Sequence, residues 1–195
     1  MKRFAALLLA AVICFGFCGC KSSKTEKIGV DVEYYAKLGK IKELDFAIGD
    51  DGEAAVKKIE SSLAEGDKQE GDAADEGTVT YGYDEEFCSV YEGDGYFSVS
   101  LPQASFNYDS ESKEIFRIVS FSRSYGFDIG TVSIEIKKAL SSYGFDSEER
   151  SLTEEERTMV AGTADDTCLE YKFGDNCVFF AFGENSLYAT VIYKT

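Results

Sequence analysis

The sequence predicts an α+β fold built as two tandem modules, each with one helix laid on an antiparallel sheet. Two observations carry this prediction. A segment with helical periodicity at residues 48–63 has a second copy at residues 129–144. The strand-like segments that begin at Cys88 and Cys168 match at an offset of eighty residues (168 − 88), which also relates Lys57-Lys58 to Lys137-Lys138 within the two helical segments. Self-similarity at a fixed spacing indicates an internal duplication.

The chain begins with a predicted signal peptide at residues 1–19. A basic start, Met1-Lys2-Arg3, precedes an apolar run at residues 4–17. This run is shorter than the roughly 20 residues that a membrane-spanning helix needs, and is typical of a secretory leader.

Gly19-Cys20 closes this leader, and a small residue before a Cys at such a place resembles the lipobox of bacterial lipoproteins. The resemblance implies that Cys20 is acylated on its sulfur, typically with palmitate, and becomes the first residue after cleavage. Two acyl chains suffice for stable membrane anchoring. Phe17 departs from the Leu usual in this motif, and Cys18 is an alternative acylation site. An ordinary secreted protein cleaved nearby is the other interpretation.

Residues 20–43 are predicted to be the lipidated Cys and a flexible tether. The segment is polar and rich in lysine, as expected of a solvated linker whose lysines face anionic headgroups. A brief helix near Tyr34 is a further possibility.

Two helices follow from the apolar periodicity. In the first, Asp50 and Glu53 suggest a capping box, and in the second Thr131 is expected to be the N-cap and Gly144 to end the helix. Each helix has one apolar stripe. The stripes are Ala55, Val56, Ile59 and Leu63 in the first and Val132, Ile136, Ala139, Leu140 and Tyr143 in the second.

Eight strands are predicted from β-branched and aromatic segments between short Gly, Asp and Asn turns. They form one sheet in a module at 44–124 and another in a module at 125–195. In one strand Phe97 and Val99 are expected to face the helix, while Tyr96 and Ser98 point outward. The strands are Thr78–Tyr83, Phe87–Tyr91, Tyr96–Leu101, Ser105–Tyr108, Ile115–Ser122, Thr167–Phe173, Cys177–Phe182 and Leu187–Lys194.

This order of helix and antiparallel meander, occurring twice, resembles the β-lactamase-inhibitor-protein-like superfamily, whose single-module relatives include SmpA/OmlA-type envelope lipoproteins. The local signals are Ile48-Gly49 and Ile129-Gly130 before the two helices. The resemblance covers about residues 44–195 and implies protein binding rather than catalysis. No inhibitory residue of that family has a counterpart here.

The composition narrows the classes of function. The formal net charge of −16 argues against nucleic acid as a partner, because neutralising phosphates needs a basic surface. The absence of His removes Ser-His-Asp and Cys-His catalysis and His-based metal sites. The acidic loops lack the spacing of an EF-hand, so neither a metal nor a cofactor is predicted. The chain is not expected to be an enzyme.

Three cysteines lie outside the leader: Cys88, Cys168 and Cys177. A turn at residues 174–175 places Cys177 opposite Lys172, which excludes a hairpin disulfide with Cys168. Cys88 and Cys168 would be neighbours if the two modules met about a pseudo-twofold axis. Buried free thiols are the favoured interpretation.

Tyrosines at matched positions give the candidate binding surface. Tyr supplies a large contact area at low entropy cost and is favoured in interfaces. The proposed surface is a concave sheet framed by Tyr91, Tyr96, Tyr108, Tyr171 and Tyr188. The alternative is that these rings pack sheet edges and the contact between modules.

The resulting hypothesis is a membrane-anchored extracytoplasmic lipoprotein that acts as a protein-interaction or ligand-binding module. Its expected partners are the membrane, through Cys20, and an envelope or extracellular protein. A structural lipoprotein of envelope assembly is the alternative. A carboxylate-dependent glycan hydrolase ranks third.

Overall fold

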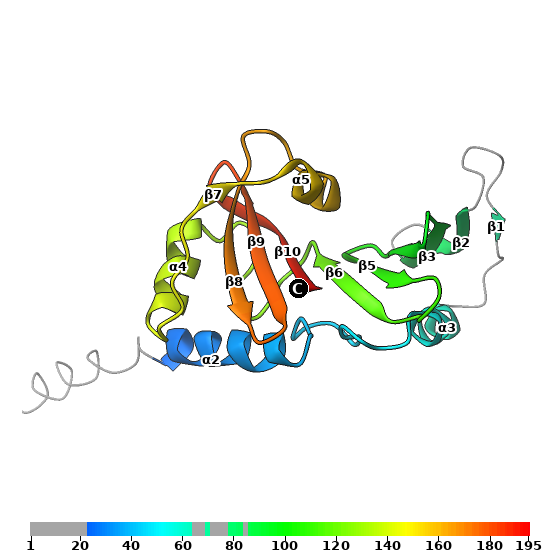
Figure 1. Cartoon of the computed structure of the whole chain (residues 1–195), viewed down its shortest axis with the longest axis horizontal. Coiled ribbons are helices and arrows are strands. Elements are labelled where there is room, and N and C mark those ends of the chain that lie inside the picture. The colour runs from blue at the N-terminus through cyan, green and yellow to red at the C-terminus, as the bar shows by residue number, and fades with distance from the viewer. Residues whose placement is uncertain (1–22, 64–68, 71–77, 84–85) are drawn as a thin grey trace, which may run out of the picture.

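A computed structural model describes residues 23–63, 69–70, 78–83 and 86–195. The signal peptide and Cys20 lie outside this part of the chain. Four helices and ten strands are described (Figure 1). The helices are α2 (Ser23–Lys37), α3 (Gly52–Ser62), α4 (Ser133–Ser141) and α5 (Glu154–Val160). None of these helices has both the length and the apolar character required to cross a bilayer.

All the strands belong to one antiparallel sheet in the order β1-β2-β3-β4-β5-β6-β10-β9-β8-β7. Eight of them have five or more residues and match the eight predicted strands within two residues at each end. They are β2 (Thr78–Tyr83), β3 (Glu86–Glu92), β4 (Tyr96–Ser100), β5 (Ala104–Asp109), β6 (Ile115–Ser120), β8 (Thr167–Phe173), β9 (Asn176–Gly183) and β10 (Ser186–Lys194), while β1 (Gln69–Glu70) and β7 (Arg150–Ser151) are short edge strands.

The prediction of two tandem helix-plus-sheet modules is wrong. The last strand, β10, pairs with β6 from Thr190↔Ser120 to Tyr193↔Arg117, so the segments at 44–124 and 125–195 share one sheet. One core cluster also spans both segments and contains Phe106 together with Phe180. The structure is therefore an α+β fold organised around a single sheet.

Helices α2, α3 and α4 cover one face of this sheet, called here the helix-covered face. Figure 1 shows α2 beneath β8 and β9, with α3 at the far end of the sheet near β3. Helix α3 begins with Asp51 as its N-cap, where the carboxylate accepts a 2.9 Å hydrogen bond from the Ala54 amide. The predicted cap Asp50 instead accepts from the Ala47 amide at 2.8 Å.

Helix α4 begins two residues after its predicted cap. Val132 takes the N-cap position without a side-chain hydrogen bond, and the Thr131 hydroxyl donates to the Asp128 carbonyl at 2.7 Å instead. Gly144 adopts the predicted left-handed conformation, with φ of 81°. Of the predicted stripe, Val132 is 38% exposed, because the helix starts after it, whereas Ile136 and Leu140 are fully buried.

The prediction of a flexible tether at 20–43 is wrong for its described part. Helix α2 buries Val32 and Ala36 completely, and Ile41 after it is also buried. The Ala36 carbonyl accepts a 3.0 Å hydrogen bond from Asn176 of β9. Lys37 is exposed on this segment, whereas the buried positions carry small and branched residues.

The opposite face of the sheet, called here the α5 face, is only partly covered. Helix α5 packs over β8, β9 and β10 through Val160 and a second cluster that includes Phe179 and Val191. Thr153 and Glu156 form a complete capping box at its start. Arg150 binds Glu156 at 2.7 Å and Glu170 at 2.9 Å. The hydrogen bond from Arg150, together with those from Thr153, lowers the pKa of Glu156 to about 2.

The three cysteines outside the leader are buried free thiols. Cys177 pairs with Lys172, which confirms the predicted register. Cys88 and Cys168 are not neighbours, because five strands separate β3 from β8 in the sheet. Burial raises the pKa of Cys88 to about 11 and of Cys168 to about 12, so neither thiol is a reactive nucleophile near neutral pH.

The packing of α2 yields a direct test of the corrected fold. A Cβ on Gly29 would lie 2.0 Å from the Tyr143 ring, so either this ring or α2 has to shift. We expect Gly29→Ala to lower the free energy of unfolding by about 1–3 kcal/mol. Val30→Ala is the matched control, because Val30 is 51% exposed. Chemical denaturation measures both, and a G29A protein as stable as V30A would restore the tether interpretation.

Candidate functional site

The five predicted tyrosines do not form one surface. Tyr108 and Tyr171 are 4% and 3% exposed and belong to the core cluster of the helix-covered face. Tyr91 pairs with Ser98 next to Tyr96 on the other face, where Tyr91 is 45% exposed. The Tyr188 hydroxyl donates to the Asp166 carboxylate at 3.0 Å near the end of α5. The prediction that these five tyrosines frame one binding surface is therefore wrong.

Strand alternation explains this error. Tyr171 lies two residues from Leu169 and Phe173, all buried, and therefore shares their face. Tyr108 is in the same relation to Phe106 and stacks on Phe97 with ring centroids 5.0 Å apart. The alternation of apolar residues with a period of two is visible in the sequence. It determines which face of the sheet a tyrosine occupies, whereas the match between equivalent positions of the two segments does not.

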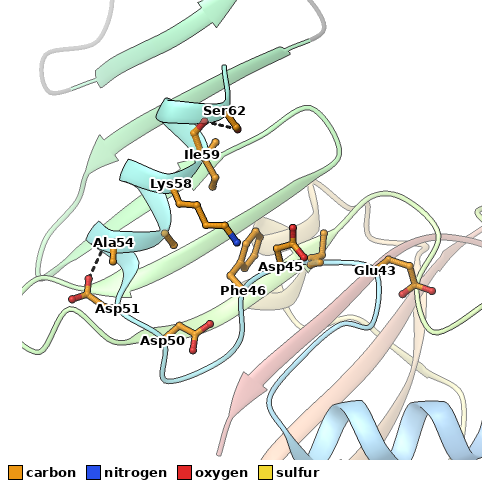
Figure 2. A pocket seen from close by; sticks show the side chains of 11 residues that line it. Glu43, Asp45, Phe46, Asp50, Asp51, Ala54, Lys58, Ile59 and Ser62 are labelled. Atoms are coloured by element: carbon orange, nitrogen blue, oxygen red, sulfur yellow. Dashed lines mark hydrogen bonds between the residues drawn. The ribbon is translucent and has the colours of Figure 1, made fainter. Parts of the chain in front are cut away.

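A pocket with a volume of about 580 Å³ lies between α3 and the segment at residues 43–51 (Figure 2). Its size is in the range that binds small ligands. The lining residues are Glu43, Leu44, Asp45, Phe46, Asp50, Asp51, Ala54, Ala55, Lys58, Ile59 and Ser62. One wall lies at the junction between the predicted tether and the predicted first module, and the other belongs to a predicted helix, so the sequence contained no local signal that the two walls meet.

The apolar part of this pocket is fixed by the core. Phe46 is 8% exposed and packs on Phe106 of β5, with ring centroids 4.7 Å apart. Ala55 and Ile59 of α3 are partly buried against the same cluster. The apolar floor is thus part of the folded framework and is preformed.

Three of the four acidic side chains around the pocket have structural roles. Glu43 accepts from the amides of Tyr125 and Gly126 at 2.8 and 3.0 Å, which ties the segment to the turn after β6. Asp50 and Asp51 accept the hydrogen bonds described above from Ala47 and Ala54. These carboxylates hold the pocket in shape.

Asp45 and Lys58 are different, because neither side chain forms a hydrogen bond or an ion pair with any residue in the described part of the chain. Figure 2 shows the Lys58 side chain extending from α3 across the pocket toward Phe46 and Asp45. One carboxylate and one ammonium group are therefore available to a ligand that contacts the apolar floor. This arrangement can bind an amphipathic molecule that carries both an amine and a carboxylate.

Two features of the described residues bear on metal binding and on acid catalysis. Within the described ranges, no group of three or more Cys, Asp or Glu side chains has the arrangement of a metal site. The shifted carboxyl pKa values, those of Asp109, Glu156 and Asp166, are all lowered. For Asp166, burial opposes the shift, and hydrogen bonds from Thr163 and Tyr188 outweigh it. A glycan hydrolase needs a carboxyl whose pKa is raised to act as general acid.

Comparison with solved structures finds a likeness to YjgB, a DUF4309 family protein from Bacillus subtilis subsp. subtilis str. 168. The TM-score is 0.50 at 15% sequence identity, and the match covers 88% of this chain and 97% of that chain. At this identity the likeness concerns the fold alone. No protein-family model matches the chain, and no curated protein matches it significantly.

The position of Tyr171 gives a test of the corrected site. Its hydroxyl is buried and has no hydrogen-bond partner among the described residues, and burial raises its pKa to about 12. We expect Tyr171→Phe to leave the free energy of unfolding unchanged or raise it by up to about 1 kcal/mol, since an unpaired polar group is removed. Tyr171→Ser should lower it by about 3 kcal/mol through the cavity it creates.

The exposed Tyr91 provides the control, because Tyr91→Ser should change stability by less than about 0.5 kcal/mol. Thermal and chemical unfolding measure all three variants. Equal stabilities of the two Ser variants would show that Tyr171 is a surface residue after all.

Proposed function

We propose that this chain is a membrane-anchored extracytoplasmic lipoprotein whose folded body binds a small amphipathic ligand. The observation that carries the proposal is the pocket beside α3, where a preformed apolar floor meets the unpaired Asp45 and Lys58. The ligand has an apolar centre, an amine directed to Asp45 and a carboxylate directed to Lys58. A short free peptide, for example one released from an envelope or extracellular protein, has this chemistry.

The anchoring part of the proposal is supported by α2. Val30 and Tyr34 of α2 and Leu38, directly after the helix, are 51%, 59% and 56% exposed and follow one another at intervals of four residues. Helix α2 begins three residues after Cys20 (23 − 20). An acylated Cys20 holds this apolar stripe at the membrane surface, where apolar and Tyr side chains are favourable.

A structural role in envelope assembly is the second candidate. It is favoured by a separate exposed apolar group before and within α4, formed by Ile129, Val132 and Ile134, which are 44%, 38% and 65% exposed. Burying this group against a second copy of the chain would drive self-association. Concentration-dependent dimerisation in solution, abolished by Ile134→Ser, would support this function.

Ligand binding is tested with the dipeptide Leu-Leu and its N-acetylated and C-amidated forms. We expect the unmodified dipeptide to perturb amide NMR signals of Phe46 and Ile59, and each blocking group to weaken binding about tenfold, because one charge-assisted contact is lost. In Asp45→Asn, N-acetylation of the dipeptide should no longer weaken its binding. In Lys58→Gln, C-amidation should no longer weaken it.

The matched control variants are Asp94→Asn and Lys138→Gln, which change exposed charges elsewhere. Both should bind all three probes as the unmodified protein does. Absence of any perturbation at the pocket, or equal binding of blocked and free dipeptides, would contradict the proposed ligand.

Anchoring is tested by cell fractionation and mass spectrometry of the full-length chain. We expect Cys20→Ala to move the protein out of the membrane fraction and to remove the acyl mass, because the thiol that receives the lipid is gone. Cys18→Ala is the matched control and should stay acylated and membrane-bound. If the C18A protein left the membrane fraction and the C20A protein stayed in it, the acylation site would be Cys18. If both variants stayed in the membrane fraction without an acyl mass, a lipid anchor at either position would be excluded.

A further inference from the structure

The uncovered part of the α5 face contains a second, polar cleft, separate from the pocket beside α3. Its volume is about 330 Å³, and it lies between the edge of α5 and strands β4, β5 and β6. A smaller hollow of about 280 Å³ shares Arg117, Glu155 and Met159 with it and continues toward Phe179 and Tyr193. The lining residues of the polar cleft are Tyr96, Ser98, Ser105, Asn107, Arg117, Val119, Glu155, Thr158 and Met159.

Arg117 lies where these two hollows meet. Its Nε donates to the Asn107 Oδ1 at 3.3 Å, and its guanidinium lies 5.8 Å from the centre of the Phe116 ring. Burial lowers its pKa, which shows that the charge is partly removed from water. It forms no ion pair within the described part of the chain.

Of the other three arginines in the described part of the chain, Arg157 donates to the Leu152 carbonyl at 3.0 Å, and two pair with carboxylates. Arg150 binds two carboxylates, those of Glu156 and Glu170, and Arg123 lies 3.5 Å from the Asp128 carboxylate. Arg117 is thus a half-buried cation whose two terminal nitrogens, with four N–H groups, have no partner in the described chain. In a chain with a net charge of −16, carboxylates were available for pairing.

Asn107 provides a second set of unused donors in the same cleft. The residue is 5% exposed, its oxygen is oriented by Arg117, and its amide nitrogen has no hydrogen-bond partner in the described part of the chain. The Asn107 amide nitrogen is not among the fully buried described side-chain atoms that lack a partner, so it is open to the cleft and a ligand can reach it. An oxyanion between the guanidinium and this amide would satisfy both groups.

The remaining lining residues define what carries the anion. Ser98 and Ser105 present hydroxyl groups from β4 and β5, and Tyr96 lies beside Phe116 with the rings edge to face at 6.4 Å. These groups suit a scaffold with several hydroxyl groups and C–H faces. Glu155, exposed at the rim, is the one charged group of the cleft that opposes an anion.

We propose that this cleft is a binding site for a carboxylate or phosphate group carried on a hydroxyl-bearing scaffold, such as a sugar acid or a polyol phosphate. Arg117 binds two oxygens of the anion side by side, as its planar guanidinium favours. Asn107 donates to the same group, and Ser98 and Ser105 bind the hydroxyls. The site does not use Asp45 or Lys58.

Isothermal titration calorimetry with four probes tests this site: D-glucuronate, sn-glycerol 3-phosphate, and their neutral counterparts glucose and glycerol. We expect saturable binding of at least one anionic probe at least about tenfold tighter than its neutral counterpart. Binding of glucuronate alone identifies a sugar acid, and binding of glycerol phosphate alone a polyol phosphate. Inorganic phosphate binding as tightly as either would overturn the role of the scaffold.

Three variants locate the binding. Arg117→Lys keeps the charge without the paired donors and should weaken binding about tenfold, with circular dichroism confirming its fold. Glu155→Gln, an exposed change that leaves the framework intact, should tighten binding because the opposing charge is removed. Lys58→Gln should leave it unchanged, which separates this site from the pocket beside α3. No binding of any anionic probe, or weaker binding in E155Q, would overturn the proposal.

Discussion

The lateral pairing of β6 with β10 is the constraint on which the rest of the structure depends. The segment before β6 and the segment after it each contribute a meander, and this pairing turns two sets of strands into one sheet with a shared core. A single sheet of this width has two faces to cover. Helices α2, α3 and α4 cover one face, whereas α5 covers only part of the other. The two proposed binding sites follow from this imbalance.

Each site lies where a helix meets an incompletely filled part of the sheet. On the helix-covered face, the segment at 43–51 runs between α2 and α3 and leaves the pocket floored by Phe46. On the α5 face, one edge of the short helix faces β6, and Arg117 lies beside this edge. The first site combines an apolar floor with two opposite charges, and the second combines donors with hydroxyl groups. The chemistry of the two sites differs, and so do the ligands proposed for them.

Much of the local structure could be predicted from the sequence. Strand alternation and turn residues located eight strands, because these signals are local, and Gly144 ended α4 as expected. The pairing of β6 with β10 could not be predicted, because local sequence signals do not determine which strand pairs with which across a long connection. Helix α2 was obscured because its lysines masked the buried spacing of Val32 and Ala36. Helix α5 was missed although Thr153 and Glu156 form a capping box that was readable in advance.

The candidate sites were less predictable than the fold. Tyr108 and Tyr171 were placed on a surface by matching positions, whereas their alternation with buried neighbours puts them in the core. Asp45, Lys58, Asn107 and Arg117 belong to no sequence motif, and only the folded chain brings them into cavities.

The single shared sheet is tested most directly by native-state hydrogen exchange of amides in β6 and β10. A common, slowest exchange rate across Ile118, Val119, Val191 and Ile192, with one unfolding transition, is expected. Distinct exchange free energies for the segments at 44–124 and 125–195 would contradict the account.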